Sequence, residues 1–382
     1  MKRLLFSALA LVVFAVMLAP AGCSKGTEPA TGTETPLELM LRAVVPESLT
    51  TIMYDDIAVV STYNGRAVPA FSASQDEKNA WWQAIQSKML FSFPAPVFAD
   101  FWGFDATQIT GSLTAWSDLV DSTASLTMVY GTPDTKGFGD KLTSYGYVKE
   151  TYRGHTLYTG TPDTGDTGAD AMLGGAYGVI TPVTSGDRPT SIILMTSTGN
   201  QDLAATRQAV QNAIDAYVDK TAVGYTDTPL SVMARSIGKV GNAFILDGTS
   251  YLSYSAALRT QVEDVVARAV GPGNLDNFRD MAITYHEDAA GSYLDFILEF
   301  DTAELAAANR DVLNERLSGG RKIIPEPDRP TSVYWSVVSV TADGPTLTGT
   351  VRLTDALLQR DAFLNEMVYT LDFWFLHPGL FN

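Results

Sequence analysis

The stretch MAITYHEDAAGSYLDFILEF (residues 281–300) carries the clearest structural pattern in the chain. In its second half, large apolar residues occupy every second position from 294 to 300, with Asp295 and Glu299 between them. Such alternation is typical of a β-strand with one buried face. Ala290-Gly291 separates this strand from a similar run over 281–286, so the stretch predicts a β-hairpin.

Similar glycine-containing turns occur on either side of this hairpin in the sequence. Arg153-Gly154 separates strand-like residues 147–152 from 155–158, and Asp343-Gly344 separates 333–340 from 347–353. Short hairpin turns join antiparallel strands. The sequence therefore predicts antiparallel sheets.

Four other segments keep apolar residues at helical spacing, which predicts amphipathic helices. Their apolar stripes are Leu203, Val210, Ile214 and Tyr217; Leu258, Val262, Val265 and Ala269; Leu305, Val312, Leu313 and Leu317; and Leu357, Leu364, Val368 and Leu371. Because helices alternate with hairpins, we expect them to cover one face of each sheet. The predicted fold class is α+β, with antiparallel sheets each covered by helices.

The length of 382 residues suggests about two domains. We expect a first α+β domain over residues 37–235 and a second over 236–382. A strand, an Asp-Thr pair, a helix and a glycine follow one another over both 125–146 and 292–319. This recurrence fits two related domains that arose by duplication, and it fits two unrelated strand–helix units equally well.

Composition limits the classes of function. Apolar residues make up 46% of the chain and charged residues 18%, so we expect a packed core. The acidic net charge of −17 argues against a nucleic-acid partner, because phosphate backbones are bound by clustered cations. The single cysteine excludes an intramolecular disulfide and a zinc site built from cysteines.

Residues 1–22 are arranged like a secretory signal peptide. Lys2 and Arg3 precede an apolar run from Leu4 to Leu18, and small residues follow. This run is shorter than the roughly 20 residues of a membrane span. We therefore expect residues 1–22 to be removed and the body of the protein to lie outside the cytoplasm.

Ala21-Gly22-Cys23 resembles the lipobox of bacterial lipoproteins, although Pro20 stands where that family usually has leucine. The resemblance implies cleavage before Cys23, acylation of this cysteine with palmitate-like chains, and attachment to a membrane through the lipid. Ser24 follows the cysteine, where an aspartate would favour the inner membrane. The resemblance thus implies the outer membrane, if the organism has one.

Residues 24–36, SKGTEPATGTETP, contain no large apolar side chain. Such a composition does not bury enough surface to offset the entropy of ordering. We expect residues 23–36 to be a flexible tether between the lipidated Cys23 and the body.

Asp166-Thr167-Gly168-Ala169 resembles the catalytic loop of retropepsin-like aspartic proteases. In that family large apolar residues lead into the aspartate, and residues 161–165 contain none. We therefore interpret residues 160–175 as an acidic surface loop. Asp163, Asp166 and Asp170 make this loop a weak candidate for calcium, without the spacing of an EF-hand. We expect no other metal and no cofactor.

The three histidines, His155, His286 and His377, lie far apart in the sequence and lack metal-binding spacing. We expect His155 and His286 to be exposed residues at hairpin turns. The sequence contains no nucleophile elbow, no phosphate-binding loop and no dinucleotide-binding motif.

Aromatic residues gather between positions 81 and 104. Trp81 and Trp82 are adjacent, so on a helix they point about 100° apart, and we expect one to stay partly exposed. The predicted binding surface is formed by Trp82, Phe98, Phe101 and Trp102, because exposed aromatic residues are frequent anchors for partners. The alternative is a helix and an apolar loop packed on the first sheet.

Residues 104–158 are similar to a pattern in uncharacterised bacterial envelope lipoproteins, and no catalytic residue follows from that resemblance. We expect a lipid-anchored protein of the cell envelope that is a non-catalytic binding or structural module. Its partner would be an envelope protein or ligand of unknown identity. The alternative is an envelope hydrolase with an unrecognised site.

Overall fold

The computed structural model describes residues 35–45, 50–90, 95–117, 124–161, 175–183, 190–198, 202–223, 229–251, 273–319, 321–322, 329–354, 363–370 and 374–376. Residues Glu34–Asn382 form one compact unit. The predicted signal peptide and Cys23, together with residues 24–34 of the tether, lie outside the described residues.

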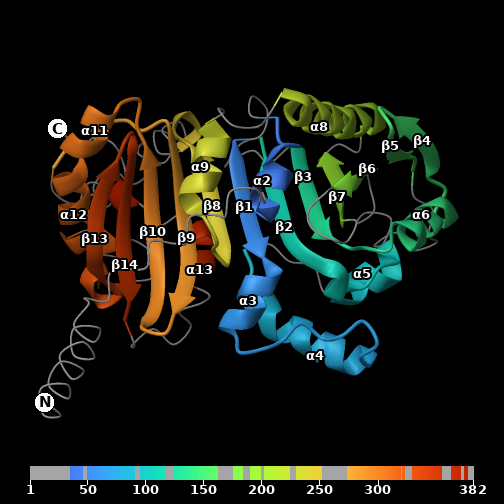
Figure 1. Cartoon of the computed structure of the whole chain (residues 1–382), viewed down its shortest axis with the longest axis horizontal. Coiled ribbons are helices and arrows are strands. Elements are labelled where there is room, and N and C mark those ends of the chain that lie inside the picture. The colour runs from blue at the N-terminus through green and yellow to red at the C-terminus, as the bar shows by residue number, and fades with distance from the viewer. Residues whose placement is uncertain are drawn as a thin grey trace, which may run out of the picture. The chain divides into compact units, whose positions relative to one another are not determined.

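A single antiparallel sheet of twelve strands runs through this unit, in the order β13-β14-β10-β9-β8-β1-β2-β3-β7-β6-β5-β4 (Figure 1). The strands are β1 (Thr51–Asp56), β2 (Ile109–Trp116), β3 (Ala124–Gly131), β4 (Val148–Tyr152), β5 (His155–Thr159), β6 (Ala176–Val183), β7 (Thr190–Thr198), β8 (Asn242–Asp247), β9 (Asp280–Asp288), β10 (Gly291–Glu299), β13 (Trp335–Asp343) and β14 (Thr346–Leu353). β11 (Arg321–Lys322) and β12 (Arg329–Pro330) form a separate pair. The α+β class with antiparallel pairing is confirmed.

The helices are α2 (Pro36–Leu41), α3 (Ile57–Tyr63), α4 (Gln75–Gln86), α5 (Ala95–Trp102), α6 (Thr135–Ser144), α8 (Leu203–Val223), α9 (Pro229–Ile237), α11 (Ala303–Ala308), α12 (Arg310–Gly319) and α13 (Phe363–Thr370), with short 3₁₀ turns η1 (Ala106–Gln108), η2 (Thr331–Val333) and η4 (Trp374–Leu376). Polar side chains begin several of them: Asp56, Ser74, Asp134 and Thr302 each accept a hydrogen bond from an amide of the first turn. No helix in the described part of the chain is long and apolar enough to cross a bilayer.

All three predicted hairpins are present. β4 pairs with β5 across Arg153-Gly154 as predicted, whereas the β9–β10 turn is Ala289-Ala290 and the β13–β14 turn is Gly344-Pro345, each one residue from the predicted dipeptide. The predicted helix over 203–217 corresponds to α8, and 363–370 of the fourth predicted helix form α13. Residues 258–269 lie outside the described residues.

One predicted helix is two in the structure. The stripe from Leu305 to Leu317 is divided into α11 and α12 at Asn309, which is buried. The Asn309 amide donates to Asp276 Oδ2 at 2.8 Å, and its side-chain oxygen accepts from the Asp276 amide at 2.8 Å. The break therefore comes from a long-range polar contact that no local pattern encodes.

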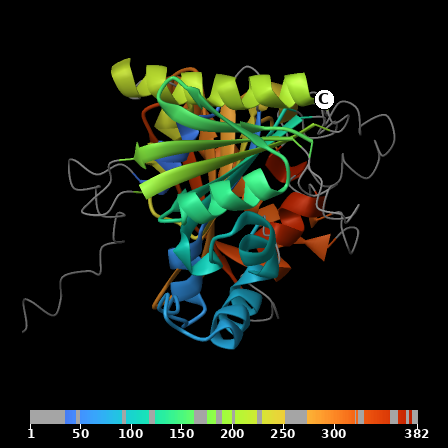
Figure 2. The same cartoon turned by 90° about the vertical axis from the view of Figure 1, so that its right-hand side faces the viewer.

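Helices cover both faces of the sheet, so the expectation of one covered face was wrong. One face, which we call the α8 face, is covered by α2, α8 and α9. It carries Ile52, Leu113, Leu126, Leu194 and Ile245. The opposite α6 face carries Val129, Ile193, Phe244 and Phe296, and α3 to α6 and α11 to α13 cover it. Figure 2 shows α8 and α6 on opposite sides of the strands at one end of the sheet. Central strands such as β7 bury consecutive residues, which requires cover on both sides.

The sheet is arranged alike on either side of the central pair β1 and β8. Outward from β1 the order begins β2, β3, β7, β6 and continues with β5 and β4, and outward from β8 the order is β9, β10, β14, β13. α2 precedes β1 and α9 precedes β8, and these two helices pack against each other. Their sequences also match: Thr35-Pro36-Leu37 with Met40 and Arg42 recurs as Thr228-Pro229-Leu230 with Met233 and Arg235.

Candidate functional site

The predicted aromatic binding surface lies in the core. Trp82, Phe98 and Trp102 are buried, and only Phe101 is half-buried. Trp82 contacts Phe98 edge-on with 5.1 Å between ring centroids, and Phe98 contacts Trp102 in the same way at 5.4 Å. These residues come together as predicted, but as an internal cluster beneath α4 and α5, so the prediction of an exposed surface was wrong.

The adjacent tryptophans show why. Trp81 and Trp82 are both buried, because α4 has neighbours on two sides. Trp81 Nε1 donates to Ser61 Oγ of α3 at 2.9 Å, while Trp82 packs on Phe98 of α5. The two side chains point about 100° apart and therefore pack against two different helices, α3 and α5. The alternative interpretation, a helix packed on the first sheet, fits this burial.

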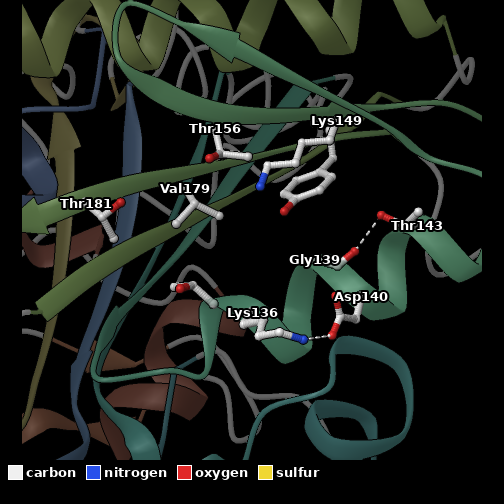
Figure 3. Close-up of a pocket in the computed structure, with 10 residues that line it drawn as sticks. Lys136, Gly139, Asp140, Thr143, Lys149, Thr156, Val179 and Thr181 are labelled. Carbon is white, nitrogen blue, oxygen red and sulfur yellow. Dashed lines mark hydrogen bonds and ion pairs between the residues drawn. The ribbon is translucent and has the colours of Figure 1, made fainter.

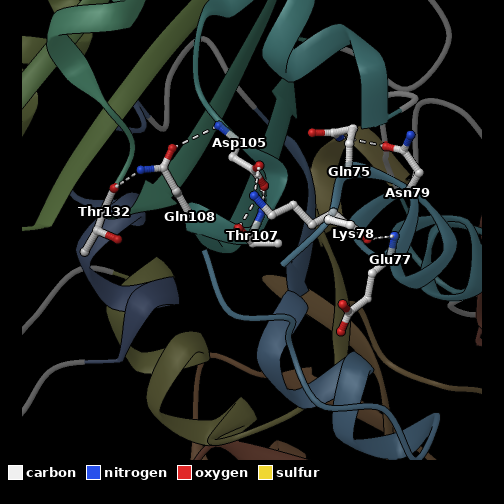
Figure 4. Close-up of polar contacts among 9 residues, drawn as sticks. Gln75, Glu77, Lys78, Asn79, Asp105, Thr107, Gln108 and Thr132 are labelled. Carbon is white, nitrogen blue, oxygen red and sulfur yellow. Dashed lines mark hydrogen bonds and ion pairs between the residues drawn. The ribbon is translucent and has the colours of Figure 1, made fainter. Parts of the chain in front are cut away.

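Polar contacts of Lys78, Asp105, Thr107 and Gln108, which we call the polar clamp, join α4 to the segment that follows α5 (Figure 4). Lys78 of α4 donates to Asp105 Oδ2 at 2.8 Å, and both side chains are at most 14% exposed. Asp105 also accepts from the Thr107 amide, and Gln108 donates to the Thr132 carbonyl. Burial acts to raise the pKa of Asp105, but the hydrogen bonds from Lys78 and Thr107 outweigh it and hold this pKa below its usual value. The clamp is structural, since its polar groups bind one another.

The weak calcium candidates Asp163, Asp166 and Asp170 lie outside the described residues, as does His377. Within the described ranges no group of three or more His, Cys, Asp or Glu side chains has a geometry suited to a metal ion.

The two described histidines are not exposed turn residues, and that expectation was wrong. His155 is the first residue of β5 and is half-buried against Tyr217, 6.3 Å between ring centroids. His286 lies within β9, where its ring stacks on Tyr293 at 5.0 Å. His155 begins a strand directly after Arg153-Gly154, as predicted, and only its exposure differs, whereas His286 lies inside β9, which continues to Asp288.

His286 belongs to a polar row on the α8 face of the second half. Its Nδ1 lies 3.2 Å from Asp295 Oδ2, and Thr350 donates to Asp295 Oδ1 at 2.7 Å. The corresponding strands of the first half are apolar beneath α8, with Leu126, Ile192 and Leu194 buried there. Among the described helices, α9 reaches β9 and β10 on this side, where Ile297 is buried with it, and the polar row lies beyond that contact.

The described residues also form a pocket of about 290 Å³ between α6 and strands β4 to β6 (Figure 3). It is lined by Thr135, Lys136, Gly139, Asp140 and Thr143 of α6, and by Lys149, Thr156, Tyr158, Val179 and Thr181 of the strands. Lys149 and Tyr158 are paired in the β4–β5 register, and Thr156 is paired with Val179 in the β5–β6 register. Their side chains therefore lie on one face of the sheet.

Glycines set how closely α6 approaches its neighbours. A Cβ at Gly137 would lie 2.6 Å from the Gly103 carbonyl oxygen, so α6 packs directly on the end of α5. A Cβ at Gly139 would lie 2.2 Å from the Tyr158 hydroxyl. The absence of both methyl groups fixes the wall of the pocket and makes room for this hydroxyl.

The polar groups of the pocket are only partly engaged by the protein. Lys136 is paired with Asp140, and Thr143 donates to the Gly139 carbonyl at 2.8 Å. In the described part of the chain, the Lys149 amine and the Tyr158 hydroxyl have no hydrogen-bond partner. Burial raises the pKa of Tyr158, with a further contribution from the charge of Asp140, so its hydroxyl stays protonated and can donate.

Sequence reasoning missed this pocket. The β4–β5 hairpin was predicted and places Lys149 opposite Tyr158, but nothing in the sequence placed α6 across it. The glycines at 137 and 139, unusual inside a helix, were the available signal for a close approach.

No protein-family model and no curated protein sequence matches the chain. Among solved structures, crystal forms I and III of TP0453 are similar at 10% sequence identity, with TM-scores of 0.35 and 0.34. These likenesses cover 90% and 88% of this chain and 99% of the other. At such TM-scores a common fold is not established.

Proposed function

We propose that this chain is a lipid-anchored protein of the cell envelope whose body is a non-catalytic binding module. The pocket between α6 and β4 to β6 carries the binding part of the proposal. It gathers an amine and several hydroxyl groups around a concave space, and small-molecule sites combine such a space with a few convergent polar groups. Asp140, the carboxylate of the pocket, is engaged by Lys136.

Thermal shift measurements on the purified body, residues 24–382, test the binding function. A library of sugars, amino acids, nucleotides and organic acids is screened against the wild type and Tyr158→Phe. Binding predicts at least one compound class that raises the melting temperature of the wild type more than that of the variant. If no compound distinguishes the two proteins, the pocket is not a binding site.

The anchoring part rests on the N-terminal pattern that ends at Cys23. Mass spectrometry of protein made in a bacterial host with lipoprotein processing is expected to show an acylated N-terminal Cys23. Cys23→Ser is expected to release the body from the membrane fraction. A mature chain that still begins at Met1 would contradict the proposal.

The matched strand order and the recurrent Thr-Pro-Leu motif support a duplication of one α+β unit. The first copy would run from Thr35 to Val223 and the second from Thr228 onward. The predicted domain boundary between 235 and 236 falls inside α9, so the start of α9 is the better division. In this proposal the copies share one sheet through β1 and β8.

The alternative function, an envelope hydrolase, is favoured by one observation. The carboxylate of Asp295 lies beside His286, and a carboxylate that orients a histidine is a component of general-base sites. His286→Gln would abolish hydrolysis of ester or peptide substrates if this pair were catalytic. Unchanged turnover in that variant would remove the alternative at this position.

A further inference from the structure

The pocket beside α6 is locally basic in an acidic protein. Its charged lining residues are Lys136, Lys149 and Asp140, which together carry a net charge of +1, although the net charge of the chain is −17. Lys136 and Lys149 come from opposite walls of the pocket (Figure 3). A site with this charge selects against cationic ligands.

The two lysines are available to different degrees. Lys149 has no partner within the described residues, so its amine can meet an anion directly. Lys136 is paired with Asp140, but both side chains are more than 65% exposed. Exposed pairs of this kind contribute little stability, so Lys136 can exchange Asp140 for a ligand anion. The α6 amides of Lys136 and Gly137 already donate to Asp134, so the lysines are the charged donors of the site.

The Tyr158 hydroxyl indicates where the ligand makes its neutral hydrogen bonds. The Tyr158 side chain is only 3% exposed, yet its hydroxyl has no protein partner in the described part of the chain. The space beside Gly139 keeps this hydroxyl at the pocket wall, where a bound ligand can accept a hydrogen bond from it.

The remaining lining residues fix the polarity and the size of the ligand. Val179 is the single aliphatic side chain among the lining residues. Thr135, Thr156 and Thr181 contribute hydroxyls that both donate and accept, and the Thr143 hydroxyl, which donates to the Gly139 carbonyl, can accept. A volume of about 290 Å³ is at the lower end of the range for small-molecule sites, roughly 300–1,000 Å³. This combination suits one compact ring bearing hydroxyl groups.

We infer that the pocket binds a small hydroxylated ring that carries an anionic group, such as a sugar phosphate or a sugar acid. The anion lies between Lys149 and Lys136, and ring hydroxyls bind Tyr158 and the threonines. This inference rests on the proposed binding function and specifies its ligand class. Free phosphate shares the anionic chemistry but lacks the hydroxyl contacts, so it should bind more weakly.

Isothermal titration calorimetry on the body (residues 24–382) tests the inference with four probes: glucose 6-phosphate, glucuronate, glucose and inorganic phosphate. At least one of the two anionic sugars is expected to bind at least tenfold more tightly than glucose and phosphate. Lys149→Met should weaken that binding about tenfold or more, as expected for loss of a charge-assisted hydrogen bond. Added salt should weaken it as well, because Lys149 is exposed.

Tyr158→Phe should weaken the same binding about fivefold while leaving the melting temperature unchanged, because the lost hydroxyl has no described protein partner. Lys239→Met is the matched control: Lys239 is an exposed lysine in the short segment between α9 and β8, and its loss should leave affinity unchanged.

The outcomes distinguish the inferred ligand class from the proposed binding function of the pocket. Equal binding of glucose and glucose 6-phosphate, unaffected by Lys149→Met but weakened by Tyr158→Phe, would overturn the anionic class and keep the pocket as a binding site. An equal effect of Lys149→Met and Lys239→Met would show general charge attraction and overturn the site assignment. If none of the probes binds, the inference is wrong, and the library screen above decides separately whether the pocket binds any ligand.

Discussion

At the scale of single residues, burial decides what a charged side chain does. Lys78 and Asp105 form an ion pair at 2.8 Å beside the aromatic cluster, and each is almost enclosed. A buried charge that loses its partner retains its desolvation penalty. Lys149, of the same residue type, is exposed in the pocket and has no partner in the described part of the chain.

Removing one partner of the clamp should therefore be more harmful than removing both. Lys78→Met is expected to lower the free energy of unfolding by about 3 kcal/mol, because Asp105 is left unpaired. Lys78→Met combined with Asp105→Asn should recover part of this loss. Urea denaturation at pH 7 measures both variants. A double variant less stable than the single one would contradict the argument.

The histidine of β5 should make stability depend on pH. Burial lowers the pKa of His155, and the nearby Arg153 charge lowers it further. The unfolded chain therefore binds a proton near pH 6.5 while the folded chain does not, so folding is penalised as pH falls below about 6.5. Between pH 7.5 and pH 5.5, His155→Gln should lose less stability than the wild type. Parallel losses would show that His155 does not contribute.

At the scale of elements, close approaches and polar contacts position the walls of the pocket. The β4–β5 hairpin is held to α8 by Arg153, which donates to Asp215 and Asp219 at 2.9 Å each. On the other face, α6 lies against the end of α5 through Gly103 and Gly137. Gly103 has φ of +72°, a conformation that side chains with a Cβ rarely adopt.

Gly137→Ala tests this contact. Alanine ordinarily favours a helix over glycine by about 1 kcal/mol. Here its Cβ would meet the Gly103 oxygen at 2.6 Å, so we expect a net destabilisation of about 1–3 kcal/mol from overpacking. Ser144→Ala, at the exposed end of α6, should be nearly neutral. A stabilised Gly137→Ala protein in thermal denaturation would show that α6 is free to move away.

At the scale of the whole described unit, both halves belong to one sheet. β1 and β8 pair at its centre, and Asn242 of β8 donates to the buried Asp55 of β1 at 2.6 Å and to the Lys88 carbonyl at 3.1 Å. Two halves joined in this way share one sheet and its core.

We therefore expect a single cooperative unfolding transition for the body, in contrast to two independent domains. Asn242→Ala should lower the midpoint of that single transition, because the Asp55 carboxylate loses a buried donor. Differential scanning calorimetry distinguishes the cases. Two separate transitions, with Asn242→Ala shifting only one, would contradict the shared core.

Local patterns in the sequence determined the strands, the hairpins and the α+β class, because alternation and turn residues act over a few positions. The β9–β10 hairpin and the apolar stripe of α8 are examples. Only the tertiary structure decided which helix covers which strand. The burial of Trp82, the division of a helix at Asn309 and the pocket between α6 and Tyr158 all depend on contacts between distant segments. A single helix shows its own apolar stripe but not its neighbours, so exposure and concave sites arise only when the chain packs.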